Sequence, residues 1–156
     1  MSRGAGDRVA DELAIRDLVH RYADAASRRD PGGVASTFTA DGEWQAVRFG
    51  RHRGDALEPF FAGMLAGWNG FVQGLLSGRV VLDVRDPDRA QGRWYVQEIG
   101  QRTEGTHFDV SGVYHDEYVR DADGWRIAWR RYDALLSRTD GVVTASPFPT
   151  DVPEID

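Results

Sequence analysis

The sequence lacks several residue types that proteins use for covalent chemistry and crosslinking. It contains no cysteine, which excludes disulfides, thiolate nucleophiles and cysteine-based metal sites. It also contains no lysine, so all 19 basic residues are arginine. Schiff-base catalysis needs a lysine amine and is therefore excluded. The 4 histidines are scattered without metal-ligand spacing, and no glycine-rich phosphate loop is present. We therefore expect neither a metal nor a cofactor.

Long apolar runs are absent too. No segment approaches the roughly 20 apolar residues of a membrane span. Residues 1–7 show no apolar signal segment, so we expect a cytoplasmic protein without membrane contact. The net charge of −6 argues against binding to nucleic acid. A chain of 156 residues is long enough for one domain with one core.

The first half of the chain carries helical patterns. Apolar residues recur at helical spacing over 8–28. Asp30-Pro31 is typical of an N-cap followed by proline at the first position of a short helix. Asp41-Gly42 predicts a turn, with a strand after it through Trp44 and Phe49.

A further helix is predicted behind residues 54–58. Asp55 and Glu58 have the spacing of a capping box. The residues that follow form one apolar helical face, made up of Leu57, Phe60, Phe61, Met64, Leu65 and Trp68.

The second half predicts four strands separated by short polar turns. Their expected ranges are 71–84, 90–102, 107–120 and 124–136. Short connections indicate an antiparallel meander. Helices followed by strands predict an α+β fold: a conical barrel of curved antiparallel sheet, with the helices on its concave face and a pocket between the layers. We expect one domain over 1–136 and a tail over 137–156 that is flexible or packs on a partner subunit.

One predicted strand face carries a carboxylate among apolar residues. Trp94, Val96 and Glu98 alternate onto the same side. Burial disfavours the charged form and raises a carboxyl pKa, so Glu98 is a candidate acid or base. The alternative is a carboxylate paired with an arginine, which would lower its pKa instead.

Other polar residues are candidates for the same pocket. A buried phenol needs a hydrogen-bond partner, which makes Tyr22 and Tyr114 candidate donors, with core packing as the alternative. Gln73 is a candidate for orienting a carbonyl or a water. Arg130 is a candidate clamp for an enolate or carboxylate, or else a structural ion pair.

Four weaker candidates complete the set. His107 is a candidate base near neutral pH, although its segment borders a loop. Asp24 is a substitute base, or an ion-pair partner of a helical arginine. Trp44 and Trp94 are candidates for an aromatic pocket wall, or core residues.

Taken together, five segments resemble a SnoaL-like domain of the nuclear-transport-factor-2-like superfamily. The matching segments are 18–23, 38–42, 92–95, 112–116 and 124–127. The resemblance implies a conical α+β barrel, frequently dimeric, with one deep pocket. Similar members include polyketide cyclases, scytalone and bile-acid dehydratases, a dehydrochlorinase and ketosteroid isomerases, which share a fold and not a reaction.

The resemblance also implies roles for individual positions. Tyr22 matches a tyrosine that several dehydratases direct into the pocket, and Glu98 matches an acidic strand position of the bile-acid dehydratase. His107 matches another pocket position loosely. Ser27 stands where a catalytic aspartate is frequent, and Gln73 stands where a catalytic histidine is frequent. The aspartate–histidine dyad of some members is therefore expected to be absent.

Three functions remain open at this point. The first is a cofactor-independent acid–base enzyme, a dehydratase, isomerase or cyclase, acting on a hydrophobic, oxygenated cyclic small molecule such as a polyketide or steroid-like metabolite. The second is a non-catalytic module that binds a small apolar ligand. The third is a dimerisation scaffold with a filled pocket. The superfamily resemblance also leads us to expect a homodimer.

Overall fold

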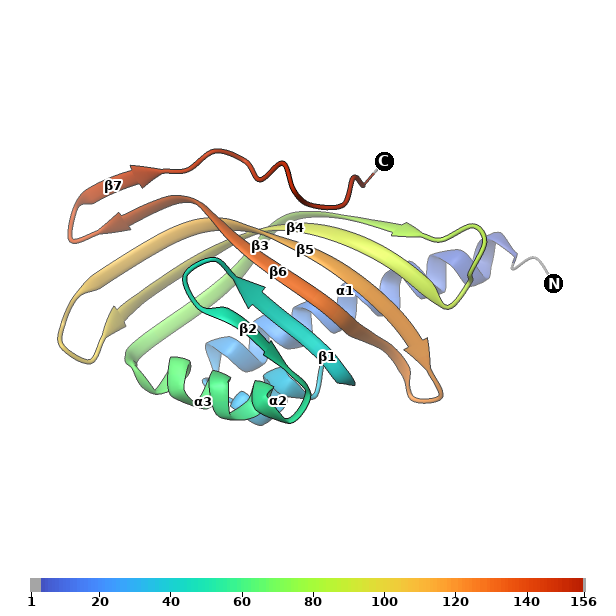
Figure 1. Cartoon of the computed structure of the whole chain (residues 1–156), viewed down its shortest axis with the longest axis horizontal. Helices are drawn as coiled ribbons and strands as arrows, with labels where there is room; N and C mark the ends of the chain where they lie inside the picture. The colour runs from blue at the N-terminus through green and yellow to red at the C-terminus, as the bar shows by residue number, and fades with distance from the viewer. Residues whose placement is uncertain (1–3, 156) are drawn as a thin grey trace.

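A computed structural model describes residues 4–155. An arched sheet carries the helices on its concave side and the C-terminal segment on its convex side (Figure 1). The helical elements are α1 (Ala5–Ser27), α2 (Pro31–Ala35), a 3-10 turn (Gly54–Ala56) and α3 (Leu57–Ala66). The strands are β1 (Phe38–Ala46), β2 (Gly50–Arg53), β3 (Trp68–Leu82), β4 (Arg89–Arg102), β5 (His107–Asp121), β6 (Gly124–Thr139) and β7 (Val142–Ala145).

The sheet is mixed and unclosed. Its order is β2-β1-β6-β5-β4-β3, and β7 pairs with the end of β6. The meander from β3 to β6 is antiparallel, as its short turns predict. β1 runs parallel to β6, however, so the expectation of a purely antiparallel sheet was wrong at this edge. The α+β class, the curvature and the concave position of the helices are confirmed.

The concave side of the sheet holds the core. The buried face of α1 includes Leu18, Val19 and Tyr22, which belong to one apolar cluster with residues of α3 and the long strands. After α1, the Asp30 side chain accepts the backbone N–H of Gly33, with Pro31 at the start of α2. The predicted cap of this short helix is thus confirmed.

Two local predictions in the first half were wrong. Asp41 and Gly42 lie inside β1, where the pairing with β6 shifts register, instead of forming a turn. A Cβ on Gly42 would approach the backbone oxygen of Ile127 to 3.0 Å, so close strand contact explains this glycine. The capping box is absent, because the N-cap of α3 is Ala56 and no side chain caps it.

The C-terminal segment packs on its own chain. β6 continues past residue 136 to Thr139, and the chain then turns into β7. Beyond β7 the segment lies along the convex face (Figure 1). There the Phe148 ring contacts His115 at 5.7 Å, and Arg131 donates to both carboxylate oxygens of Asp151 at 3.0 Å. Ile155 is buried.

None of the helices within residues 4–155 is both long enough and apolar enough to span a membrane.

Candidate active site

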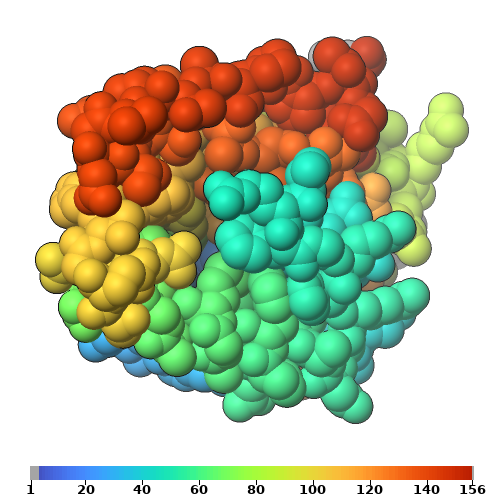
Figure 2. All heavy atoms as spheres, turned by 60° about the vertical axis from the view of Figure 1, so that its left-hand side comes forward, coloured from blue at the N-terminus to red at the C-terminus, as the bar shows by residue number. Residues whose placement is uncertain are grey.

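A small cavity lies between the concave face of the sheet and the helices α1 and α3. Its volume is about 60 Å³. The surface is hollowed between the β1–β2 turn, α3 and the turn after β4 (Figure 2). The cavity is lined by Tyr22, Ala26, Val34, Trp44, Phe49, Phe61, Met64, Leu65, Phe71, Gln73, Glu98, Tyr114 and Tyr132.

Glu98 is the carboxylate of this cavity. Its Oε1 accepts from Gln73 Nε2 at 2.7 Å, and its Oε2 accepts from the Tyr132 hydroxyl at 3.1 Å. Within residues 4–155 no arginine or histidine forms an ion pair with it. Burial raises the pKa of the Glu98 carboxyl, while the two hydrogen bonds work in the opposite direction. A buried carboxyl group with a raised pKa and neutral hydrogen-bond partners is a candidate for an acid or base.

Strand register places Gln73 directly across from Glu98. Besides donating to Glu98, its Nε2 donates to the Tyr114 hydroxyl at 3.0 Å. Its backbone N–H donates to Ser27 Oγ at 2.9 Å. The end of α1 and the start of β3 thus meet at Ser27 and Gln73, both of which have neutral side chains.

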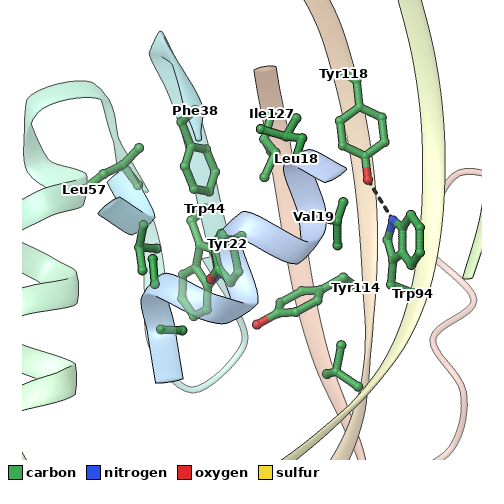
Figure 3. Close-up of a cluster of buried hydrophobic side chains, with 14 of the residues drawn as sticks. Leu18, Val19, Tyr22, Phe38, Trp44, Leu57, Trp94, Tyr114, Tyr118 and Ile127 are labelled. Atoms are coloured by element: carbon green, nitrogen blue, oxygen red, sulfur yellow. Dashed lines mark hydrogen bonds between the residues drawn. The ribbon is translucent and has the colours of Figure 1, made fainter. Parts of the chain in front are cut away.

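Two tyrosines form one wall of the cavity. Tyr22 from α1 and Tyr114 from β5 meet edge to face, with ring centroids 5.8 Å apart (Figure 3). Burial raises the pKa of Tyr22 and raises that of Tyr114 well above its ordinary value. Both phenols consequently keep their protons at neutral pH, which leaves them able to donate hydrogen bonds.

A buried ion pair supports this wall from behind. Arg130 is fully buried and forms two hydrogen bonds of 2.7 Å with the carboxylate of Asp116. The guanidinium carbon lies 4.2 Å from the ring centre of Tyr22 and 4.1 Å from that of Tyr114. Arg130 therefore holds the two rings by cation–π contact and does not itself line the cavity.

The structure brings together Glu98, Tyr22, Gln73, Tyr114 and Trp44 and leaves four other candidates apart. Trp94 lies in the core, where its Nε1 donates to the Tyr118 hydroxyl at 2.8 Å (Figure 3). Asp24 is exposed and paired with Arg28 at 2.9 Å. His107 is exposed at the start of β5. Arg130 is buried in its ion pair with Asp116, behind the wall of the cavity.

Tyr132 and Phe49 are cavity residues that sequence patterns did not single out. Tyr132 points inward because an extra residue in β6 shifts the pairing with β5 between Tyr118 and Glu117. Such a bulge reverses which residues face the core, and simple alternation cannot locate it. Phe49 lies in the turn between β1 and β2, where side chains follow neither the strand nor the helix repeat. No signal in the sequence places Tyr132, because its pairing with Tyr114 is seen only in the structure.

Across residues 4–155 no cluster of three or more histidine, aspartate or glutamate side chains is arranged to hold a metal ion. The chemistry that the cavity offers is proton transfer by one carboxyl group. Phenol hydroxyls and an amide surround that group in an otherwise apolar setting.

Comparison with known proteins finds a dehydrochlorinase of similar sequence and two solved structures of similar fold. A gamma-hexachlorocyclohexane dehydrochlorinase from Sphingobium indicum is 28% identical over 126 residues, 80% of each chain. The fold resembles that of a hexachlorocyclohexane dehydrochlorinase from Novosphingobium barchaimii, with a TM-score of 0.78 and 22% identity, over 92% of this chain and 100% of the other. It also resembles a protein from Novosphingobium aromaticivorans provisionally assigned as a scytalone dehydratase, with a TM-score of 0.80 and 20% identity, over 97% and 100%.

The family model of the SnoaL-like domain matches residues 7–131, which include α1 and every cavity residue except Tyr132. The chain therefore belongs to the SnoaL-like domain family.

Proposed function

We propose that this protein is a cofactor-independent enzyme that transfers a proton on a hydrophobic, oxygenated cyclic small molecule. The reaction is a dehydration, an isomerisation or an intramolecular cyclisation. The observation that carries this proposal is Glu98, a carboxyl group in an apolar cavity whose hydrogen-bond partners are neutral. A raised carboxyl pKa brings the group closer to the range in which a general acid or base works at neutral pH.

In the proposed reaction, ionised Glu98 removes a proton from a carbon next to a carbonyl group. The electron pair moves onto the carbonyl oxygen, and a phenol hydroxyl such as that of Tyr22 stabilises the developing charge. Protonated Glu98 then returns the proton, either to another carbon or to a departing hydroxyl group. Gln73 keeps the carboxyl in place throughout, since its amide donates to Glu98 Oε1.

The relatives support an enzyme of this general kind. The Sphingobium indicum relative is named as a dehydrochlorinase, an activity that removes hydrogen and chlorine from its substrate. Ser27 and Gln73 cannot supply the proton carrier in this chain, because neither side chain ionises near neutral pH. Within the described part of the chain, Glu98 is the cavity-lining residue that carries a carboxyl group, and burial raises the pKa of that group.

Hydrogen–deuterium exchange at carbon tests the proposal without knowledge of the natural substrate. Cyclic ketones are incubated with the protein in deuterated water, and their mass is followed. We expect the Glu98→Gln variant to lose about 10²–10⁴-fold of the exchange rate, the usual contribution of a placed acid or base. Asp24→Asn is the matched control, since it neutralises an exposed carboxylate of α1. Equal rates in the wild type and in Glu98→Gln would refute the proposal.

A ligand-binding module without activity is the second candidate. The neutral pair Ser27 and Gln73 favours it, because neither side chain ionises near neutral pH. The cavity volume of about 60 Å³ favours instead a scaffold with a filled pocket, because pockets for drug-sized ligands measure about 300 Å³ or more. The enzyme requires side chains at the rim to move, and flexible Met64 is suited to do so. Wild-type protein that binds the ketones but exchanges none of their protons would establish the binding module instead.

A further inference from the structure

Trp44 carries a buried hydrogen-bond donor without an acceptor. The residue is 3% exposed and lines the cavity. Within residues 4–155 no group accepts a hydrogen bond from its Nε1. The ring is held by contacts with Phe60 and Phe61, whose centroids lie 5.0 and 6.0 Å away. A buried unpaired donor costs about 1–3 kcal/mol, so this N–H calls for an explanation.

Two other buried tryptophans have a paired indole N–H. Trp94 Nε1 donates to the Tyr118 hydroxyl at 2.8 Å. Trp125 Nε1 donates to Asp11 Oδ1 at 3.0 Å. Neither of these two tryptophans lines the cavity. The unpaired indole thus occurs at the wall of the candidate site, while the paired ones lie elsewhere in the core.

Gln73 presents the complementary group. It is 7% exposed, and its Oε1 has no hydrogen-bond donor among residues 4–155. The amide orientation is fixed from the other side, because Nε2 donates to both Glu98 and Tyr114. A rotation of the amide would remove the hydrogen bond to Glu98 and bring Oε1 against the oxygens of its carboxyl group. The cavity wall therefore contains one unpaired acceptor as well as one unpaired donor.

We infer that Trp44 Nε1 and Gln73 Oε1 recognise the ligand, and that the ligand carries both a carbonyl oxygen and a hydroxyl group. The carbonyl accepts from Trp44, and the hydroxyl donates to Gln73. A site built to hydrogen-bond a ligand group discriminates against an analogue without that group, because its own polar atoms then stay unpaired. The preferred ligand is accordingly a cyclic hydroxyketone and not a halogenated hydrocarbon. This inference rests on the proposed function, in that it takes the same cavity as the substrate site.

Single-ring probes test the inference, since they need the least rearrangement of a small cavity. Protein labelled with nitrogen-15 is titrated with hydroxycyclohexanone, cyclohexanone and methylcyclohexane, and the indole N–H signals of its 5 tryptophans are followed by NMR. The signal missing in Trp44→Phe identifies Trp44. We expect the hydroxyketone to bind about tenfold more tightly than the ketone, and the ketone about tenfold more tightly than the hydrocarbon.

The variants then assign the preference to one atom. Trp44→Phe keeps an aromatic ring but removes the N–H, and should diminish the preference for ketone over hydrocarbon. Trp125→Phe removes an indole N–H outside the cavity and should retain that preference. Equal binding of all three probes by the wild type, an undiminished preference in Trp44→Phe, or no binding of the hydroxyketone at about millimolar concentration would each overturn the inference.

The Glu98→Gln variant separates this inference from the proposed function. Ligand preference that persists in Glu98→Gln, together with a loss of carbon deuteration, supports both. Ligand preference in a wild type that exchanges no carbon-bound proton refutes the enzyme and retains the recognition by Trp44 and Gln73. Deuteration that depends on Glu98 but shows no preference among the probes refutes the recognition and retains the enzyme.

Discussion

Two carboxylates on the concave face of adjacent strands have opposite surroundings. Glu98 of β4 lies opposite Gln73 and accepts hydrogen bonds from neutral groups. Asp116 of β5 lies opposite Arg130 and forms a bidentate ion pair with it. Strand register brings Gln73 to Glu98 and Arg130 to Asp116. The comparison teaches that the residue across from an inward-facing carboxylate decides whether that carboxylate is held in an ion pair or by neutral hydrogen-bond donors.

The largest effect on stability is expected when the ion pair between Arg130 and Asp116 is broken. Arg130→Met leaves Asp116 buried without its cation and removes the support of the two tyrosine rings. We expect a loss of about 3–5 kcal/mol in the free energy of unfolding, measured by urea denaturation. The double variant Arg130→Met with Asp116→Leu should recover most of this loss, because it removes both charges. If Arg130→Met were as stable as the wild type, the ion pair would not stabilise the fold.

The contribution of Glu98 to stability should change with pH. Folding raises the pKa of Glu98, so the folded state holds its proton more tightly than the unfolded state. Stability from this group is fully present below about pH 4.5, the ordinary value, and falls as pH rises through the folded-state pKa. Each pKa unit corresponds to about 1.4 kcal/mol. The difference in unfolding free energy between the wild type and Glu98→Gln should therefore shift in favour of the variant as pH rises. A difference that is constant between about pH 4 and 8 would contradict the raised pKa.

The smallest effect on stability is expected at an exposed ion pair near the end of α1. Asp24 and Arg28 form an ion pair one helical turn apart, with side chains more than half exposed. Solvent screens such pairs, and Asp24→Asn should change the unfolding free energy by no more than about 0.5 kcal/mol. High salt should reduce even this difference. A change above about 1 kcal/mol would mean that Asp24 has a structural role beyond this pair.

The meander and its inward residues could be predicted because long strands alternate regularly. Trp94, Val96 and Glu98 share a face in the structure as their spacing requires. β2 could not be predicted, since its sequence Gly50–Arg53 has no apolar alternation. β7 was not predicted, because a strand of four exposed residues has no alternation of buried and exposed positions. The segment after it is held by tertiary contacts such as that of Arg131 with Asp151, which sequence periodicity does not reveal.

The site was predictable to the extent that each residue lies on a regular element. Glu98, Tyr22 and Tyr114 follow from strand or helix periodicity. Their assembly around Gln73 depends on the pairing of β3 with β4, which one sequence does not specify. Phe49 depends on a turn, and Tyr132 on a bulge. Arg130 was a candidate clamp because no pattern reveals that Asp116 lies directly across from it.

The parallel pairing of β1 with β6 has a consequence for the order in which the cavity forms. Glu98, Gln73 and Tyr114 lie on strands joined by short turns, so their contacts form locally along the chain. Trp44 reaches its place only when β1 pairs with Arg130 and its neighbours, far along the sequence. Closing so long a loop is slow. We expect pulse-labelling hydrogen exchange to protect β4 and β5 before β1, which makes the wall that carries Trp44 the last part of the cavity to be completed.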